Sequence, residues 1–349
     1  MTNLKKVGLT ALAGSLVAVS AHAGELSVSG GAKFTYTAKE QDNDATTAAN
    51  SFTNHNGNRF GMQKLMSFTG SGELDNGHSV SLEHYMTSTG TLSSSILTYD
   101  MGELGALSYQ DTSGDLGIGK IDDLMPTADE EAWNGIDFNP TASSSGMVGR
   151  VDSGTTGFNY KNTFGMATVN VGYAPSGSAA SNDDGNVSGL AADAHVASNP
   201  SSESIAVQLA VMDGLQVFGG IGDKGGDSAT GEYQDDHSTI GAVYSAGPIS
   251  IGIQRSEIED NDGDASLNDE EADMFGIAFA INDNLSVSYG YQETEVQNTA
   301  TDQEVEGFSI GYSMGGMTIK AHTNEAENAT TAAAQTEMKH TEIAVSFAF

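Results

Sequence analysis

The sequence contains no cysteine, five prolines, one tryptophan, and only 13 lysine and arginine residues against 47 aspartate and glutamate residues. Without cysteine, the chain has neither disulfide bonds nor thiolate metal sites. A formal charge of −34 leaves no basic patch to neutralise phosphates, which excludes nucleic acid as a partner. The sequence carries no nucleophile-elbow or metalloprotease motif, so we expect no enzymatic activity.

Beyond residue 23, the sequence also lacks any apolar run long enough for a transmembrane helix. The first 23 residues have a different character, with Lys5 and Lys6 before an apolar stretch and Ala21-His22-Ala23 at its end. This order is typical of a Sec-type signal peptide cleaved before Gly24. The alternative, an uncleaved anchor, needs a longer apolar span. We therefore predict export, with residues 24–349 forming the working protein.

Alternation of apolar and polar residues recurs along the rest of the chain. In residues 205–211 the odd positions are large and apolar, whereas the even positions are small or polar. Residues 249–254 and 285–291 repeat this pattern. Alternation predicts strands with one apolar face and one wet face.

The connections between these segments alternate in length. Short turns are predicted at residues 75–77, 213–214, 247–248, 282–284 and 315–316, and long polar loops lie between them. Sixteen segments can be counted; the second begins near Arg59, the fifth at Gly105 and the last near Thr336. A soluble β-sandwich would also alternate, but no helix or long buried run is present to cover the apolar faces. The pattern predicts an all-β fold, a 16-stranded antiparallel transmembrane β-barrel.

Several motifs in order resemble the general porins of Gram-negative bacteria, which are trimeric and 16-stranded. They are residues 24–30 at the start of the barrel, residues 71–77 at the first turn, and the alternating last strand that ends in Phe349. Residues 125–133 resemble third-loop segments of marine alphaproteobacterial porins. The resemblance covers the whole chain. It implies a homotrimer in the bacterial outer membrane, in contact with outer-membrane lipid and lipopolysaccharide, with an inward-folded third loop.

Residues 110–155 are too many for an ordinary hairpin connection. They follow the fifth predicted strand, where the resemblance places the loop that sets the pore width. We predict that this segment is the constriction loop; a solvated external loop is the alternative. The carboxylates predicted to line the constriction are Asp115, Asp122, Asp123, Asp129, Glu130 and Glu131.

Alternation also places four basic residues on the wet face of the barrel: Lys33, Arg59, Lys161 and Lys320. Because the first, second and fifteenth strands lie close together in a closed barrel, Lys33, Arg59 and Lys320 are predicted to form a basic patch on one wall. The resemblance implies that such a patch faces an acidic third loop. The alternative is that each basic side chain simply points into water.

One acidic loop has the ligand spacing of a calcium loop. Its candidate ligands include Asp260, Asp262, Asp264 and Glu271. However, Ala265 stands where that motif needs glycine, and strands rather than helices flank the loop. A structural Ca²⁺ is thus one reading and a solvated acidic loop the other; no other cofactor is expected.

These observations predict a water-filled porin for passive diffusion of small hydrophilic solutes and ions, with a weak preference for cations. Two alternatives stay open: a substrate-specific channel, and an outer-membrane surface interaction protein or adhesin. Aromatic residues along the lumen would indicate the former, and larger or more apolar loops the latter.

Overall fold

The structure is a computed structural model that describes residues 24–43, 57–87, 92–111, 115–122, 124–136, 156–175, 201–225, 234–260, 269–297, 301–329 and 336–349. The predicted signal peptide, Asp123, Asp262 and Asp264 lie outside these residues, and Asp260 is described by its backbone alone. Of the predicted constriction loop, residues 115–122 and 124–136 are described.

Sixteen strands and two short 3₁₀ helices make up the described secondary structure. The strands are β1 (Glu25–Asn43), β2 (Phe60–Glu73), β3 (Ser79–Met86), β4 (Leu92–Asp100), β5 (Ala106–Asp111), β6 (Gly157–Phe164), β7 (Ala167–Ala174), β8 (Ser202–Met212), β9 (Leu215–Gly225), β10 (Gln234–Ala246), β11 (Ile249–Asp260), β12 (Glu270–Asn282), β13 (Leu285–Val296), β14 (Gln303–Met314), β15 (Met317–Glu327) and β16 (Thr336–Ala348). The 3₁₀ helices are η2 (Gly102–Leu104) and η3 (Gly117–Ile121). No helix in the described part of the chain is long and apolar enough to cross a membrane.

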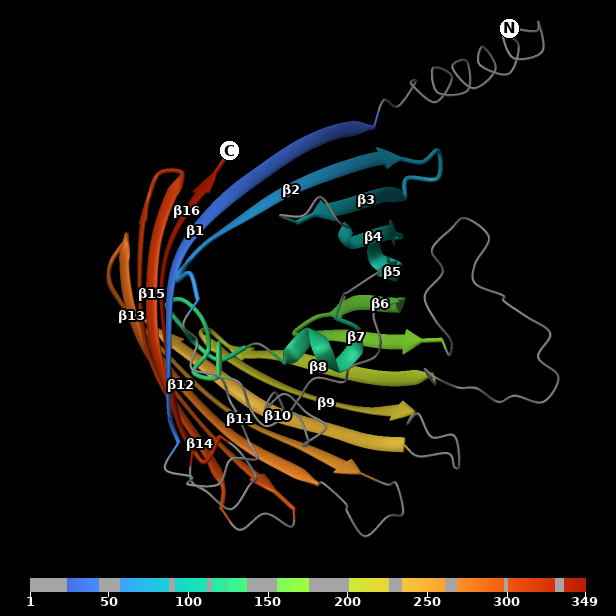
Figure 1. The fold of residues 1–349 in the computed structure, drawn as a ribbon. Coiled ribbons are helices and arrows are strands. Elements are labelled where there is room, and N and C mark those ends of the chain that lie inside the picture. Colours follow the sequence, from blue (N-terminus) through green and yellow to red (C-terminus); the bar gives the residue numbers. More distant parts are fainter. Residues whose placement is uncertain are drawn as a thin grey trace, which may run out of the picture.

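The strands form a closed antiparallel barrel in which each strand pairs with the next and β1 pairs with β16 (Figure 1). Gly30 N–H donates to Phe349 O at 2.8 Å, and Phe349 N–H donates to Gly30 O at 3.0 Å. Closure leaves no sheet edge with unpaired backbone groups. The predicted fold class is confirmed, with one boundary corrected: Gln110 and Asp111 belong to β5, so the third loop begins after Asp111.

The two faces of the barrel differ as the alternation predicts. One face carries exposed large apolar residues, including Leu26, Phe34, Ile253 and Phe308. The other face carries small and polar residues, as in the cross-strand row Ser71, Ser81, Thr98, Ser108 and Asn159. A transmembrane barrel turns its apolar face to lipid and its polar face to the lumen.

Tight turns join the strands at the predicted positions between β8 and β9, β10 and β11, and β14 and β15. Gly214 and Gly315 have φ values of +78° and +59° there, a region that glycine enters without a steric penalty.

Toward the long connections, the outer face changes from apolar to charged residues. There Arg255 pairs with Asp273 and Lys339 with Glu325, so the apolar band ends below this charged belt.

Candidate functional site

The third loop begins with η3, which is anchored to the polar face of the barrel. Gly117 N–H donates to Asn159 Oδ1 at 2.9 Å, and Ile118 N–H donates to Ser204 Oγ at 3.2 Å. Ile118 is fully buried, and with Ile121 it packs into a cluster that includes Phe218 of β9. These contacts fix η3 on the inner side of β6 to β9, because Asn159 and Ser204 belong to the inward polar row.

The loop then continues across the inner side of the later strands. Ala128 N–H donates to Ser288 Oγ of β13 at 2.8 Å. Asn324 of β15 donates through its side-chain amide to the carbonyls of Glu131, at 3.2 Å, and Asn134, at 2.9 Å. Ala132 and Ile136 of the loop pack in one apolar cluster with Val305, Ala326 and Met338 of β14 to β16. The described loop residues therefore contact the lumen face from β6 to β16.

Glycines of the barrel wall make room for the loop backbone. A Cβ atom on Gly252 would lie 2.6 Å from Pro126 Cδ, and one on Gly307 would lie 2.8 Å from Ala132 Cα. Real Cβ atoms do not approach so closely, so the loop occupies space that a larger wall residue would fill. The sequence shows these glycines, but only the path of the loop explains why a larger side chain would not fit there.

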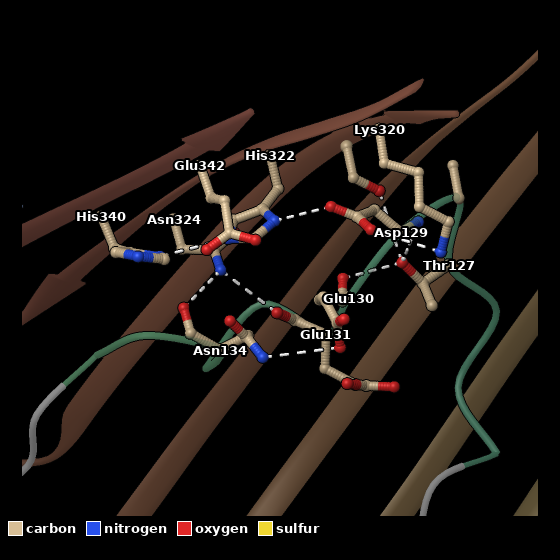
Figure 2. Close-up of polar contacts among 12 residues, drawn as sticks. Thr127, Asp129, Glu130, Glu131, Asn134, Lys320, His322, Asn324, His340 and Glu342 are labelled. Carbon is tan, nitrogen blue, oxygen red and sulfur yellow. Dashed lines mark hydrogen bonds and ion pairs between the residues drawn. The ribbon is translucent and has the colours of Figure 1, made fainter. Parts of the chain in front are cut away.

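Asp129 is a nearly enclosed charged group of the described part of the loop (Figure 2). Its carboxylate lies 3.3 Å from Lys320 Nζ and 2.7 Å from His322 Nδ1, and its side chain is 6% exposed. Burial by itself raises the pKa of Asp129, but the hydrogen bond to His322 and the charge of Lys320 outweigh it, so the pKa falls below its usual value. Asp129 is thus an ionised carboxylate tied to the barrel wall.

Glu130, its neighbour, has the opposite shift. Its side chain is partly buried, and its Oε2 accepts a long hydrogen bond of 3.5 Å from the amide of Asn134. Burial, and then the nearby charge of Asp129, raise the pKa of Glu130 above its usual value. Two adjacent carboxyl groups of the loop therefore lose their charges in different pH ranges.

The other predicted constriction carboxylates are distributed along the loop. Asp115 is exposed beside η3, and Asp122 is partly exposed after it. The Glu131 carbonyl is held by Asn324, which places this residue close to β15. The structure thus places Asp129, Glu130 and Glu131 together near β15, with Asp115 and Asp122 at the other end of the described loop.

Two of the four predicted wall cations lie on one part of the wall. Lys33 of β1 pairs across the strands with Ser346 of β16, and Lys320 of β15 pairs with Ala344, the adjacent inward position of β16. Each has an acidic partner at 3.3 Å: Lys33 lies beside Glu342, and Lys320 beside Asp129. Their positive charges are therefore largely compensated where they lie.

Arg59 and Lys161 do not join this pair. Arg59 precedes β2, and its guanidinium donates to the Tyr36 hydroxyl at 3.0 Å. Tyr36 packs edge-on against Phe60, an exposed residue of the outer face, so the Arg59 guanidinium lies beside Tyr36 and apart from Lys33 and Lys320. Lys161 is exposed on the inward row of β6, beside Asn170 of β7. It therefore lies on a different wall from Lys33 and Lys320.

Three polar residues of this wall were not anticipated from the sequence. His322 Nε2 lies 3.1 Å from His340 Nδ1, and both rings are buried. Glu342, the next inward residue of β16 after His340, accepts a hydrogen bond from Thr37 at 3.3 Å. Counting alternate residues from Lys320 reaches His322, but which side chains it meets depends on the path of the loop.

The calcium prediction falls mainly outside the described residues. Glu271, its last ligand, lies in β12 with its carboxylate 3.0 Å from Arg255 Nη1, which is an ion pair rather than a free ligand. Among the described residues, Glu293, Glu295 and Asp302 have carboxylate oxygens within 4.8 Å of one another. They lie on the exposed charged belt, and exposed acidic groups are common without a bound ion.

Comparison with known proteins agrees with the geometry. A sequence profile described as Gram-negative porin matches residues 8–331. No curated protein matches the chain.

Among solved structures, an anion-selective porin from Comamonas acidovorans has a TM-score of 0.64 at 11% identity; the match covers 93% of this chain and 100% of that chain. The loop-L8 deletion mutant of OmpT from Vibrio cholerae has a TM-score of 0.63 at 12% identity, covering 94% and 100%. A trimer form of OmpT has a TM-score of 0.59 at 13% identity, covering 94% and 100%. At such identities the likeness shows the fold alone.

Proposed function

Because this outer-membrane protein belongs to the Gram-negative porin family, we propose that its barrel is a water-filled channel for small hydrophilic solutes and ions, narrowed by the third loop and partly selective for cations. A barrel of this size has an aqueous interior unless something fills it. Here the described loop residues fill part of it, which makes the loop the element that limits passage.

The observation that carries this proposal is the position of the loop on the wall. Its contacts fall on Gln110 at the end of β5 and on the strands from β6 to β16. The inward rows of β2 to β5 include Ser81, Thr98 and Ser108, all partly exposed. We infer that solutes pass between the loop and this polar wall, while lipid and lipopolysaccharide surround the apolar outer band.

The local charge balance favours cations in this passage. Lys33 and Lys320 are compensated by Glu342 and Asp129, so they oppose cations only weakly. Glu130 and Glu131 follow Asp129 in the loop and add two further carboxyl groups beside this wall, and the chain as a whole has a charge of −34. Carboxylates at a narrow, low-dielectric passage raise the local cation concentration. Family membership favours a channel over a catalyst.

The test is a reversal potential measured across a planar bilayer in a KCl gradient. We expect a cation preference that decreases at high salt, because the screening length shortens to about 3 Å at 1 M. The variant Asp122→Asn/Asp123→Asn/Glu130→Gln/Glu131→Gln should reduce this preference while the channel still conducts. Asp283→Asn, in the short turn after β12, is the matched control and should leave the preference nearly unchanged. A chloride preference in the wild type would overturn the selectivity, and the absence of conductance would overturn the channel itself.

A further inference from the structure

A chain of three polar groups joins the third loop to the barrel wall. Asp129 Oδ2 lies 2.7 Å from His322 Nδ1, and His322 Nε2 lies 3.1 Å from His340 Nδ1. The three residues come from the loop, β15 and β16 (Figure 2). The side chain of His322 is 1% exposed and that of Asp129 6%, so water contributes little to this chain of contacts.

The number of protons in this chain is constrained by its geometry. An ionised carboxylate only accepts hydrogen bonds, so His322 Nδ1 carries a proton toward Asp129. The facing nitrogens of His322 and His340 then form a hydrogen bond only if exactly one of them carries a proton. If both rings become imidazolium, two N–H groups point at each other across 3.1 Å, and the hydrogen bond is replaced by repulsion.

The surrounding charges do not neutralise two imidazolium ions. Lys320 faces the chain from β15, Lys33 and Lys39 from β1, Glu342 from β16 and Glu130 from the loop. Lys39 is the direct cross-strand partner of His340. Asp129 and Glu342 already face lysines, and Glu130 loses its charge early as pH falls, because its pKa is raised by burial. The second proton on the histidine pair therefore meets a surplus of positive charge.

The loop is packed directly against the ring that would move. The turn at residues 132–135 ends at Gly135, which has φ +75° and lies so close to His340 that a Cβ atom there would overlap the imidazole. We propose that the Asp129–His322–His340 chain is an acid-sensitive contact: double protonation of the histidine pair in acid separates the rings and displaces the 132–135 turn from β16. His322 keeps its bond to Asp129, so the 132–135 turn is displaced while Asp129 stays in place.

The sole tryptophan, Trp133, lies within this turn and reports its position. Its carbonyl accepts a hydrogen bond from Ile136 N–H at 3.1 Å, and its side chain packs beside the cluster around Phe218. Fluorescence of Trp133 is measured on the full chain folded in detergent, while pH is lowered from about 7.5 to about 3.5, a range that extends well below the ordinary histidine pKa of about 6.5. This readout needs no ion transport, so its failure is distinct from failure of the proposed channel.

We expect a reversible emission change in the wild type that is lost in His340→Gln, since glutamine still donates to His322 but cannot acquire a charge. His78→Gln is the matched control, because His78 sits in a short turn bonded to Tyr99 at 2.6 Å, and it should retain the change. Glu130→Gln should retain it as well. A wild type without the change would overturn the proposal, as would a change that survives in His340→Gln or disappears in Glu130→Gln.

Discussion

At the scale of single residues, glycines of the lumen wall lie where the third loop packs most closely against the strands. Gly252 lies under Pro126 and Gly307 under Ala132, each within a distance that real Cβ atoms essentially never show, and a Cβ at Gly276 would lie 3.1 Å from Pro126. A glycine inside a strand weakens the strand and is retained where another backbone must approach. These glycines are therefore explained by the close approach of the loop to the wall.

Replacing Gly307 by alanine should displace the loop near Ala132, because the new Cβ would lie 2.8 Å from a backbone atom. Overpacking of this kind costs about 1–3 kcal/mol. We expect a lower unfolding temperature and a shifted Trp133 emission for Gly307→Ala. Gly70→Ala is the control, since a Cβ at Gly70 has no neighbour within 4 Å. Equal behaviour of the two variants would contradict the close approach of loop and wall.

At the scale of elements, the loop is held by side chains of the strands that bind its backbone amides. The first amides of a helix lack partners within it. In η3 these are satisfied by Asn159 of β6 and Ser204 of β8. Ser288 binds the amide of Ala128 in the same way. A segment with little regular structure is thereby fixed by the barrel on which it lies.

Asn159→Ala should loosen η3, because it leaves the buried amide of Gly117 without an acceptor. An unsatisfied buried donor costs about 1–3 kcal/mol. We therefore expect hydrogen exchange of the η3 amides to accelerate roughly 5- to 100-fold, as measured by mass spectrometry. Asn162→Ala serves as control, since Asn162 of the same strand bonds Glu103 and Tyr160 instead of the loop. Unchanged exchange in Asn159→Ala would show that η3 is held by its apolar contacts alone.

At the scale of the whole molecule, the outer face is not uniform. On β1 the outward row contains Gly30 and Ala32, and Ala32 pairs with Lys64 of β2. Small and charged residues suit protein contact better than lipid contact. On the far side, Ile249, Ile251 and Ile253 of β11 present large apolar side chains. This asymmetry favours subunit contact through the first strands.

We predict a homotrimer that associates through β1 and β2. Ala32→Trp should convert the trimer to a monomer on an unheated detergent gel, because a large side chain there prevents close subunit packing. Ile251→Trp, on the lipid-facing side, should leave the trimer intact. A wild-type protein that is monomeric after mild detergent extraction would refute the prediction.

The barrel was largely predictable because its signal is local. Each strand needs alternation over a few residues, and each short turn needs its own glycine or asparagine. The predicted starts near Arg59, Gly105 and Thr336 fall within one residue of β2, β5 and β16. The short fifth segment and the closure of the last strand on the first followed from the same pattern. Burial of one face and solvation of the other are satisfied strand by strand.

Only the tertiary structure decided which polar groups meet. Asp129 and His322 are 193 positions apart, and their contact depends on the path of a loop whose sequence has no periodicity. Alternation predicted that Lys33 and Lys320 point inward, but it did not predict that Glu342 and Asp129 are their partners. It did not predict the hydrogen bond of Arg59 to Tyr36, because Arg59 stands outside β2, where the pleat no longer dictates direction. The face to which a strand side chain points is determined by its neighbours along the chain. The side chains that it contacts are determined by the closure of the barrel and by the path of the loop on its inner face.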